Sequence, residues 1–528
     1  MKWLVLSLCL TLLMPSWAQR NWHLKDLHDD GFAGISLDMA YQLLQKNNRK
    51  STPVIVAILD SGVDTIHEDL KPFLWTNPDE IPNNGKDDDG NGFVDDIHGW
   101  NFLGNAKGEN IDSETLEKTR LYARLLKKYQ NIDTTKFTIQ ESQEWQLFKK
   151  VKIDYEKSLN QKKKEYEMLQ SLYERTIRVK LALNNILHKD SITQEDIKQL
   201  KESTNDTIRN YARMYERINK GGFDEKMLID ELNNVKKKLD TELNPNYNIR
   251  SIVGDDPFNI NDSIYGNNDI MGPSCGHGTF VAGIIGADRN NNNDAVGIAD
   301  NIKFMVLRIV PGGDERDKDV ANAIKYAARK GARILNMSFG KSYSPEKYMV
   351  DKALAIAAQK QVLCIHAAGN NSENNDEILH FPTPYDEKGK LITPYWLDVG
   401  ASNVKPDETL AASFSNYGQK SVDLFAPGVR IYSTRPQHRF QSSNGTSAAC
   451  PVVSGVAALL MSYFPELNTE QIREIILKSV VKYKHKVYVP TQSENKGIIS
   501  FKKLSITGGI VNAEKAVKLA LKFAKKVK

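Results

Sequence analysis

Three polar residues lie next to glycines where the chain passes from one predicted element to the next. Asp60 ends the apolar run "PVIVAILD", His277 lies in "CGHGTFVAGIIGA" and Ser447 lies in "NGTSAACP". A serine hydroxyl is a weak nucleophile until a histidine takes its proton, and the histidine needs a carboxylate to fix its tautomer. Flanking glycines let backbone and substrate approach closely. Together these side chains could carry out nucleophilic acyl transfer.

Each of these residues also has an ordinary structural explanation. An aspartate after a strand is often a turn residue, a single histidine is more often structural, and a serine before a helix is usually a cap. Ser447 precedes Pro451 and the apolar run "VVSGVAALLMSYF", which predicts a turn that presents one hydroxyl at a helix N-terminus. The combination, in the chain order Asp, His, Ser, is what favours catalysis.

The elements that must position these residues alternate between strands and helices. β-Branched apolar runs typical of buried parallel strands occur at "PVIVAILD", "KFMVLRIV", "ARILNMSF" and "VLCIHAAGN". Between them, "DKDVANAIKYAARKG" and "YMVDKALAIAAQKQ" have apolar residues at spacings of three and four, as amphipathic helices do. The alternation predicts an α/β fold with a doubly covered, mostly parallel sheet.

The composition changes between about residues 105 and 245, where Lys, Glu, Gln, Asn and Leu dominate. A long amphipathic helix is predicted from apolar residues that recur mostly at spacings of three or four: Phe148, Val151, Tyr155, Leu159, Tyr166, Leu169, Tyr173 and Ile177. A second helix is expected in "DSITQEDIKQL", with Ser191 and Gln194 in capping-box positions, and a third before Pro245. The segment is interpreted as an all-α helical hairpin or bundle inserted into the α/β domain.

The net charge of the chain indicates which kinds of partner it can bind, and the N-terminal sequence indicates its cellular location. The formal net charge of +5, from 71 basic and 66 acidic residues, lacks the concentrated basic surface of a nucleic-acid-binding protein. Residues 1–18 combine Lys2, an apolar core and small residues before Gln19, which predicts a signal peptide and an exported protein, periplasmic or secreted. A membrane anchor is the alternative, but the apolar run is shorter than the roughly 20 residues of a span, so we expect no stable membrane span after signal removal.

Three cysteines follow the predicted signal peptide: Cys275, Cys364 and Cys450. An odd number cannot all pair within the chain, so at least one thiol is free and disulfides are not the framework of the fold. Cys275 and Cys450 lie close in sequence to His277 and Ser447. We expect them to be small buried apolar residues, and inhibition by thiol-seeking metals is the alternative.

Five stretches, in order, resemble the signatures of the subtilisin-like serine peptidases (subtilases): "DSGVD", "GHGTFVAGIIGA", "LNMSFG", "HAAGNN" and "GTSAACPVVSGVAAL". The resemblance covers about residues 50–104 and 250–515. It implies that Ser447 is the nucleophile, His277 the general base and then acid, and Asp60 the orienting carboxylate. It also implies that Asn370 is the side-chain donor of an oxyanion hole, for which the backbone N–H of Ser447 is a second donor.

Two positions depart from the family pattern. Phe280 stands where the family often has a second histidine, and Ala448 follows the nucleophile where methionine is common. Both residues are apolar and neither position belongs to the triad, so we expect altered packing rather than lost activity.

The resemblance also implies where a protein or peptide substrate binds. Ser338, Phe339 and Gly340 match an edge that pairs with an extended substrate strand, and Ala368 and Gly369 are further predicted substrate-binding residues. The resemblance implies that a second edge of the enzyme also pairs with the substrate strand, and the loop "PGGDERDKD" lies where that edge begins. Its carboxylates could favour basic substrate side chains, although a solvated loop is the alternative.

One acidic stretch, "NNGKDDDGNGFVDDIHGW", predicts a structural calcium site because oxygen-bearing side chains alternate around glycines. The candidate ligands are Asp87, Asp89, Asn91, the carbonyl oxygen of Phe93, Asp95 and Asp96. The stretch is not an EF-hand, because His98 stands at the twelfth position. An Asn-Gly turn is the alternative.

The predicted organisation is a signal peptide at 1–18, a short segment at 19–52, a catalytic domain at 53–104 and 246–528, and the helical insertion at 105–245. The predicted function is that of an exported serine endopeptidase that hydrolyses peptide bonds through an acyl-enzyme. The competing hypothesis is a catalytically silent protein of the same fold that binds a partner through its helical insertion. A structural or adhesive surface protein is a third hypothesis, which no added anchoring or repeat module supports.

Overall fold

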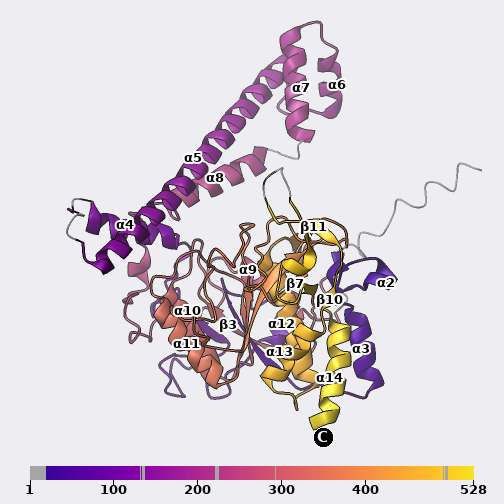
Figure 1. The fold of residues 1–528 in the computed structure, drawn as a ribbon. Coiled ribbons are helices and arrows are strands. Elements are labelled where there is room, and N and C mark those ends of the chain that lie inside the picture. The colour runs from indigo at the N-terminus through magenta and orange to yellow at the C-terminus, as the bar shows by residue number, and fades with distance from the viewer. Residues whose placement is uncertain are drawn as a thin grey trace, which may run out of the picture. The chain divides into compact units, whose positions relative to one another are not determined.

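The computed structural model describes residues 20–130, 132–133, 137–220, 225–291, 293–491, 493 and 497–527, so the predicted signal peptide at 1–18 lies outside the described residues. The chain forms two compact units (Figure 1). Unit 1 combines the chain up to Asp112 with the chain from Ile249 onward, and unit 2 consists of Ser113–Asn248.

Unit 1 is built on a nine-stranded sheet in the order β10-β13-β7-β6-β5-β4-β1-β3-β2. Neighbouring strands are parallel except for the pair β10 and β13. The strands are β1 (Val54–Asp60), β2 (Gly99–Asn101), β3 (Ile302–Arg308), β4 (Ile334–Met337), β5 (Leu363–Ala367), β6 (Trp396–Ser402), β7 (Leu424–Pro427), β10 (Val481–Lys482) and β13 (Gly509–Ile510). The predicted fold class, α/β with a mostly parallel sheet, is confirmed.

Helices cover both faces of this sheet. Along β1, Val56 and Ile58 belong to one hydrophobic core and Ala57 and Leu59 to another, because successive side chains of a strand point to opposite faces. Figure 1 shows α10 and α11 on one side of the sheet and α12, α13 and α14 on the other. The helices of unit 1 are α2 (Leu27–Asp30), α3 (Leu37–Lys46), α9 (Gly276–Gly286), α10 (Asp317–Arg329), α11 (Lys347–Gln359), α12 (Thr446–Tyr463), α13 (Thr469–Lys478) and α14 (Ala513–Val527).

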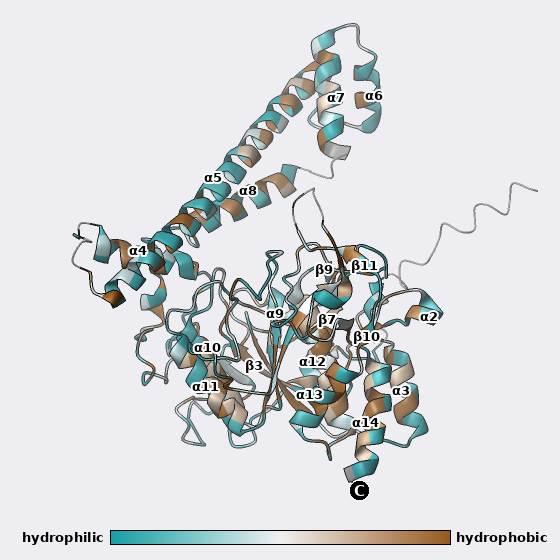
Figure 2. Ribbon diagram, viewed as in Figure 1, coloured by the Kyte–Doolittle hydropathy of each residue, from teal (hydrophilic) through white to brown (hydrophobic). Residues whose placement is uncertain are grey.

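The central helix α12 is strongly apolar (Figure 2). Among the described residues it is the one helix long and apolar enough to cross a membrane, and 89% of it is buried inside the protein. Its composition therefore matches its place in the core of unit 1.

Two short hairpins and four 3-10 helices complete the part of unit 1 that the structure describes. The hairpin β8 (Ile431–Arg435) and β9 (Arg439–Ser443) leads directly into α12, and β11 (Lys486–Tyr488) pairs with β12 (Ile498–Ser500). The 3-10 helices are η1 (Trp22–Leu24), η2 (Lys71–Phe73), η4 (Arg250–Ile252) and η5 (Phe501–Lys503). Trp22 is buried and donates from Nε1 to the carbonyl of Val429, so the N-terminal segment is part of the core.

Unit 2 contains α4 (Glu117–Tyr129), α5 (Ile139–Leu187), α6 (Gln194–Lys201), α7 (Asp206–Lys220) and α8 (Glu225–Asp240). The residues predicted to share one long helix all lie in α5, which begins with a capping box of Thr138 and Glu141. α6 begins with a capping box of Thr193 and Asp196, so the prediction of Ser191 and Gln194 was wrong. Both pairs have the same spacing. The chain uses Thr193 and Asp196, and the Asp196 carboxylate also accepts a hydrogen bond from Lys189.

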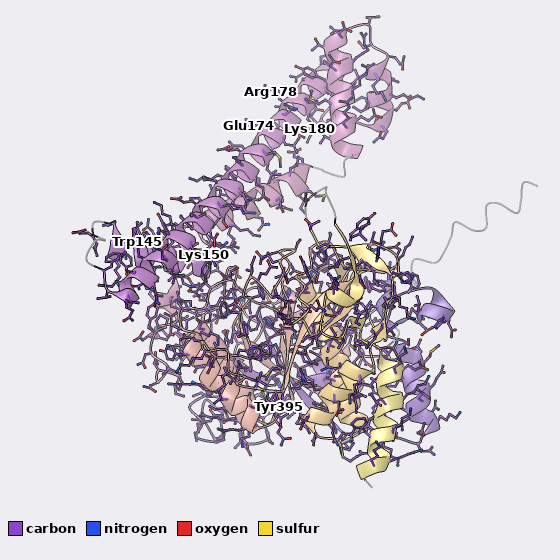
Figure 3. The ribbon with its side chains drawn as sticks, viewed as in Figure 1. Trp145, Lys150, Glu174, Arg178, Lys180 and Tyr395 are labelled. Atoms are coloured by element: carbon purple, nitrogen blue, oxygen red, sulfur yellow. The ribbon has the colours of Figure 1, made fainter. Side chains whose placement is uncertain are left out.

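The helices of unit 2 pack on one another, and its two ends meet. Trp145 packs at tilted angles against the rings of Tyr129 and Phe148 near one end of α5, and Lys180, farther along, pairs with Glu225 of α8 (Figure 3). The backbone N–H of Leu116 donates to the carbonyl of Glu242 at 2.9 Å. The chain therefore enters and leaves this unit at neighbouring points.

Candidate active site

Asp60 and His277 form a hydrogen-bonded pair. Asp60 is the last residue of β1 and is buried, and His277 lies in the first turn of α9. The distance between Asp60 Oδ1 and His277 Nδ1 is 2.7 Å, and Oδ1 also accepts from the backbone N–H of Ser61. When Nδ1 of the imidazole donates to this carboxylate, Nε2 is left with a lone pair that can accept a proton.

The environment of His277 keeps it both basic and accessible. Burial lowers the pKa of the imidazole, but the charge of Asp60 and the hydrogen bond to it outweigh burial and hold the pKa above its ordinary value of 6.5. The side chain of His277 is still 42% exposed. A base with these properties can exchange a proton with a bound substrate.

Ser447 lies in the first turn of α12, two residues after Gly445. A Cβ atom on Gly445 would lie 2.8 Å from Ser447 Oγ and 3.8 Å from Asn370 Nδ2, so both groups border the space that glycine leaves open. The carbonyl of Ser447 faces Pro451, which has no N–H to donate, and accepts from Ser338 Oγ at 3.1 Å instead. This bond lets a proline sit inside α12 without an unpaired carbonyl.

Hydrogen bonds to the amide oxygen of Asn370 fix the orientation of its side chain. Its Oδ1 accepts from the backbone N–H of Thr446 at 2.9 Å and from Thr446 Oγ1 at 3.1 Å. The Thr446 hydroxyl in turn accepts from the backbone N–H of Gly369. With Oδ1 engaged, the Nδ2 amide group of Asn370 is the part that remains to donate to a ligand.

A hollow of about 270 Å³ brings most of the predicted site residues together. It is lined by His277, Ser338, Phe339, Gly340, Ala367, Gly369, Asn370, Asn371, His380, Thr446 and Ser447. Ala368, predicted to bind substrate, is not part of the lining; it is fully buried and its neighbour Ala367 lines the hollow. Sequence reasoning missed His380, because "ILHFPTP" matches none of the motifs.

The two departures from the family pattern and the cysteines lie in packed surroundings. Phe280 is buried, with the guanidinium of Arg435 5.0 Å from its ring centre. Ala448 is buried too. The cysteines of the described chain are free and buried, and burial raises the pKa of the Cys450 thiol to about 12.

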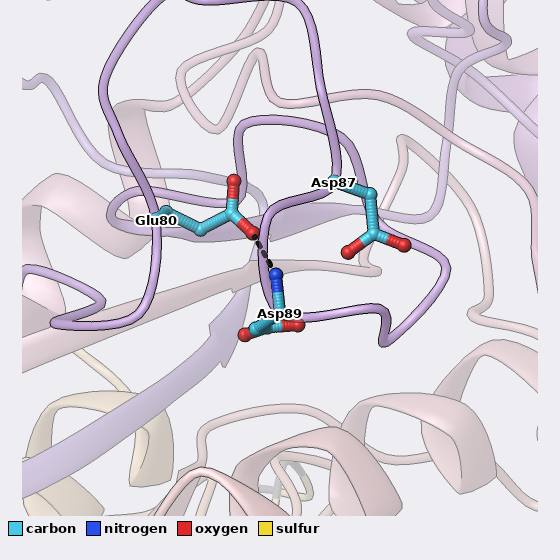
Figure 4. A group of neighbouring side chains, drawn as sticks. All are labelled: Glu80, Asp87 and Asp89. Carbon is cyan, nitrogen blue, oxygen red and sulfur yellow. Dashed lines mark hydrogen bonds between the residues drawn. The ribbon is translucent and has the colours of Figure 1, made fainter.

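The acidic loop gathers a different set of oxygen atoms from the predicted one. Glu80, Asp87 and Asp89 each place a carboxylate oxygen within 4.8 Å of the others (Figure 4). Glu80 Oε1 accepts from the backbone N–H of Asp89, while Glu80 Oε2 is buried and has no hydrogen-bond partner among the described residues. Sequence reasoning missed Glu80 because it precedes the acidic motif.

The other predicted ligands have protein partners. Asp95 accepts from the backbone N–H groups of Asn84 and Gly85, and buried Asp96 accepts from the hydroxyl of Tyr326 at 2.6 Å. The predicted ligands Asn91 and Phe93 bond each other, with Asn91 Oδ1 accepting from the backbone N–H of Phe93 at 2.7 Å. These bonds shape the loop. Asp87 and Asp89 have protein partners as well: Asp87 accepts from the backbone N–H groups of Asn91 and Gly92, and Asp89 accepts from Asn77 Nδ2 and Lys330 Nζ.

Comparison of the sequence with known proteins identifies the family of this chain. A family model described as "Subtilase family" matches residues 51–498. Subtilisin DY from Bacillus licheniformis is 33% identical over 202 residues, which cover 38% of this chain and 68% of that protein. The cell wall-associated protease of Bacillus subtilis (strain 168) is 34% identical over 214 residues, 40% of this chain but only 22% of that protein. A protease structure from Pseudoalteromonas arctica PAMC 21717 aligns at 16% identity and a TM-score of 0.47, covering 95% of this chain and 97% of that chain.

Proposed function

The chain belongs to the subtilase family, and we propose that it is a serine endopeptidase that cleaves peptide bonds in proteins or peptides through an acyl-enzyme. The observation that most supports this is the 2.7 Å hydrogen bond between Asp60 and His277, beside a hollow that Ser447 also lines. A carboxylate, an imidazole and a hydroxyl in this relation are the parts of a nucleophilic triad.

In the first step, Ser447 Oγ bonds to the carbonyl carbon of the substrate and its proton passes to His277 Nε2. The imidazole then carries a positive charge, which Asp60 stabilises from the other side of the ring. The carbonyl π electrons move to the substrate oxygen, giving a tetrahedral intermediate with a negative oxygen.

Two donors would stabilise that oxygen. One is the Nδ2 amide of Asn370, whose orientation is fixed because its oxygen is bonded to Thr446. The other is the backbone N–H of Ser447, which lies in the first turn of α12 and so benefits from the positive end of the helix dipole.

The intermediate collapses when His277 gives its proton to the leaving amine and the carbon–nitrogen bond breaks. The acyl group now forms an ester with Ser447. Water then attacks the ester with His277 as the base, and the return of the proton to Ser447 Oγ releases a carboxylic acid. Backbone pairing with Ser338 to Gly340 would hold the substrate in an extended form during both steps.

The acidic cluster is proposed to bind a structural calcium ion. Glu80, Asp87 and Asp89 would hold the ion, and its charge would satisfy Glu80 Oε2, which lacks a protein partner. Burial raises the pKa of Glu80, so a nearby cation would favour its charged form. An ion bound there would stabilise the loop without taking part in the reaction.

We also propose that the protein is exported, to the periplasm or the medium. The basis is the sequence of residues 1–18, with one lysine, an apolar core and small residues before Gln19. Fractionation of cells that produce the full chain, with N-terminal sequencing of the recovered protein, tests this. Recovery from the cytoplasm with residues 1–18 intact would contradict it.

Labelling with a fluorophosphonate tests the peptidase proposal against the silent interaction protein. The reagent reacts with a serine only when a neighbouring base activates it. Wild-type protein should be labelled on Ser447, and folded Ser447→Ala protein should not be labelled. Absence of labelling in folded wild-type protein would instead favour the interaction protein.

A further inference from the structure

His380 closes one side of the hollow that contains Ser447. The backbones of Lys341 and Phe381 exchange hydrogen bonds of 3.0 and 2.9 Å, which places His380 beside Gly340. A Cβ atom on Gly340 would lie 2.2 Å from His380 Cε1, and one on Gly369 would lie 3.0 Å from His380 Nε2. The imidazole therefore extends between the two predicted substrate-binding segments, and any side chain that enters between them meets it.

Two further polar groups lie behind His380. His366 Nδ1 lies 2.6 Å from Asp398 Oδ1, and Asp398 Oδ2 accepts from Trp396 Nε1, so Asp398 serves as an acceptor. The ring centres of His366 and His380 are 5.6 Å apart. His366 Nε2 and His380 Nδ1 are both buried and, among the described residues, have no hydrogen-bond partner. Nε2 of His380, on the side of the ring near Gly369, is therefore the nitrogen that a ligand in the hollow can reach.

We propose that His380 is a specificity-determining residue that selects a short acidic side chain, aspartate or glutamate, immediately before the cleaved bond. The inference rests on the proposed peptidase function and names the substrate class of the same site. No aspartate or glutamate is among the described residues that line the hollow, so an incoming carboxylate would meet no like charge.

A bound carboxylate can accept a hydrogen bond from Nε2 of His380, the ring nitrogen that lies toward Gly369. Burial, together with the charge of His366, lowers the pKa of His380 to about 3, so the imidazole is neutral in the free protein. When the substrate carboxylate binds, His380 takes up one proton from solvent and donates from Nε2 to the carboxylate. His366 Nδ1 stays paired with Asp398 Oδ1 at 2.6 Å. The pocket gains one negative and one positive charge, so its net charge does not change.

His380 also limits the size of the substrate side chain that fits in the hollow. Because His380 lies between Gly340 and Gly369, a large aromatic side chain cannot enter without displacing the imidazole. Short side chains that end at the imidazole are therefore favoured over long or aromatic ones.

Peptide p-nitroanilides that differ only in the residue before the cleaved bond test this proposal. With Glu, Gln, Ala and Phe at that position, the wild-type kcat/KM for Glu should exceed that for Gln roughly ten- to hundredfold, as one charged hydrogen bond allows. His380→Gln keeps the size of the side chain and a neutral donor, and should bring the Glu to Gln ratio close to one. His380→Gly should in addition admit Phe. His485→Gln, an exposed histidine in the same unit, should leave the order of the four substrates unchanged.

Labelling by a fluorophosphonate does not depend on the side chain before the cleaved bond and separates the two possible failures. Folded wild-type protein that is not labelled would contradict the peptidase function itself. Labelled protein that prefers Phe, or that cleaves Glu and Gln substrates equally, would overturn the role of His380 alone. The role of His380 alone would also be overturned if His380→Gln is labelled at the wild-type rate and keeps the wild-type order of substrates.

Discussion

Asp60 and His277 are 217 positions apart in the chain, yet Asp60 Oδ1 lies 2.7 Å from His277 Nδ1. The close approach depends on Gly278, since a Cβ atom there would lie 2.1 Å from the carbonyl oxygen of Gly62. The glycine after His277 thus lets the start of α9 pack directly on the turn that follows β1. All of unit 2 is inserted between the two members of this pair.

Asp60→Asn should lower kcat by about 10⁴-fold, because an amide in place of the carboxylate favours the wrong tautomer of His277. It should also move the pH dependence. Catalysis needs neutral His277, so kcat/KM rises as pH passes the imidazole pKa, which Asp60 holds above 6.5 in the native protein. Without the charge of Asp60 that pKa falls, and the midpoint should move to lower pH. A profile of kcat/KM against pH on a peptide ester measures this, and an unchanged midpoint would contradict the coupling.

Asn370→Ala should lower kcat roughly 10²- to 10³-fold with little change in KM, because the lost donor acts on the negative oxygen of the transition state. Asn374→Ala is the matched control: Asn374 belongs to the same loop, is not among the described residues that line the hollow, and donates from Nδ2 to Glu377, so kcat should change little. Steady-state kinetics on one peptide substrate give both values. A raised KM with normal kcat would mean that Asn370 binds the ground state of the substrate.

Removal of calcium with a chelator should lower the melting temperature, because an ion bound only to the folded state stabilises it by mass action. Glu80→Gln combined with Asp87→Asn should abolish the difference between calcium and chelator. Asp79→Asn, which changes an exposed carboxylate outside the cluster, should keep it. A melting temperature that does not respond to chelator in the wild-type protein would leave the acidic loop as a hydrogen-bonded turn.

Replacement of Ser113–Asn248 by a short Gly-Ser linker should leave hydrolysis of a small peptide ester within about tenfold of wild type, a difference of about 1.4 kcal/mol in the barrier. The two ends of unit 2 meet, and Asp60, His277 and Ser447 belong to unit 1. Cleavage of folded proteins should change more, if unit 2 limits which substrates enter or holds a partner. A deletion protein that melts cooperatively yet loses ester hydrolysis would show that unit 2 belongs to the catalytic machinery.

Four strands of the parallel sheet, β1, β3, β4 and β5, could be predicted because each lies in a short apolar run with its own local signal. The other five strands of this sheet are not β-branched runs and were not predicted. The long helix α5 could be predicted because it also has a local signal, an apolar stripe that repeats over many turns. The start of α6 was misplaced because Ser191 and Thr193 are each followed three residues later by a residue that can close a capping box. Local pattern alone does not choose between them.

The composition of the acidic cluster could not be predicted, because it depends on which carboxylate oxygens the fold brings close together. Asp96 is occupied by Tyr326, a residue of α10 that is far away in sequence, while Glu80 is brought in from outside the motif. His380 was missed for the same physical reason. Its position follows from the backbone pairing of its neighbour Phe381 with Lys341 and from the space left by two glycines, and neither feature has a signal in the residues around His380.

The central claim is that Ser447 and His277 act as one catalytic unit, and kinetics of their single and double alanine variants test it most directly. Ser447→Ala and His277→Ala should each lower kcat for a peptide substrate by about 10⁶-fold, and the double variant should be no slower than either, because loss of one member already disables the other. Thermal unfolding of each protein confirms that it is folded. Losses that multiply in the double variant, or a folded single variant with near-normal kcat, would contradict the triad.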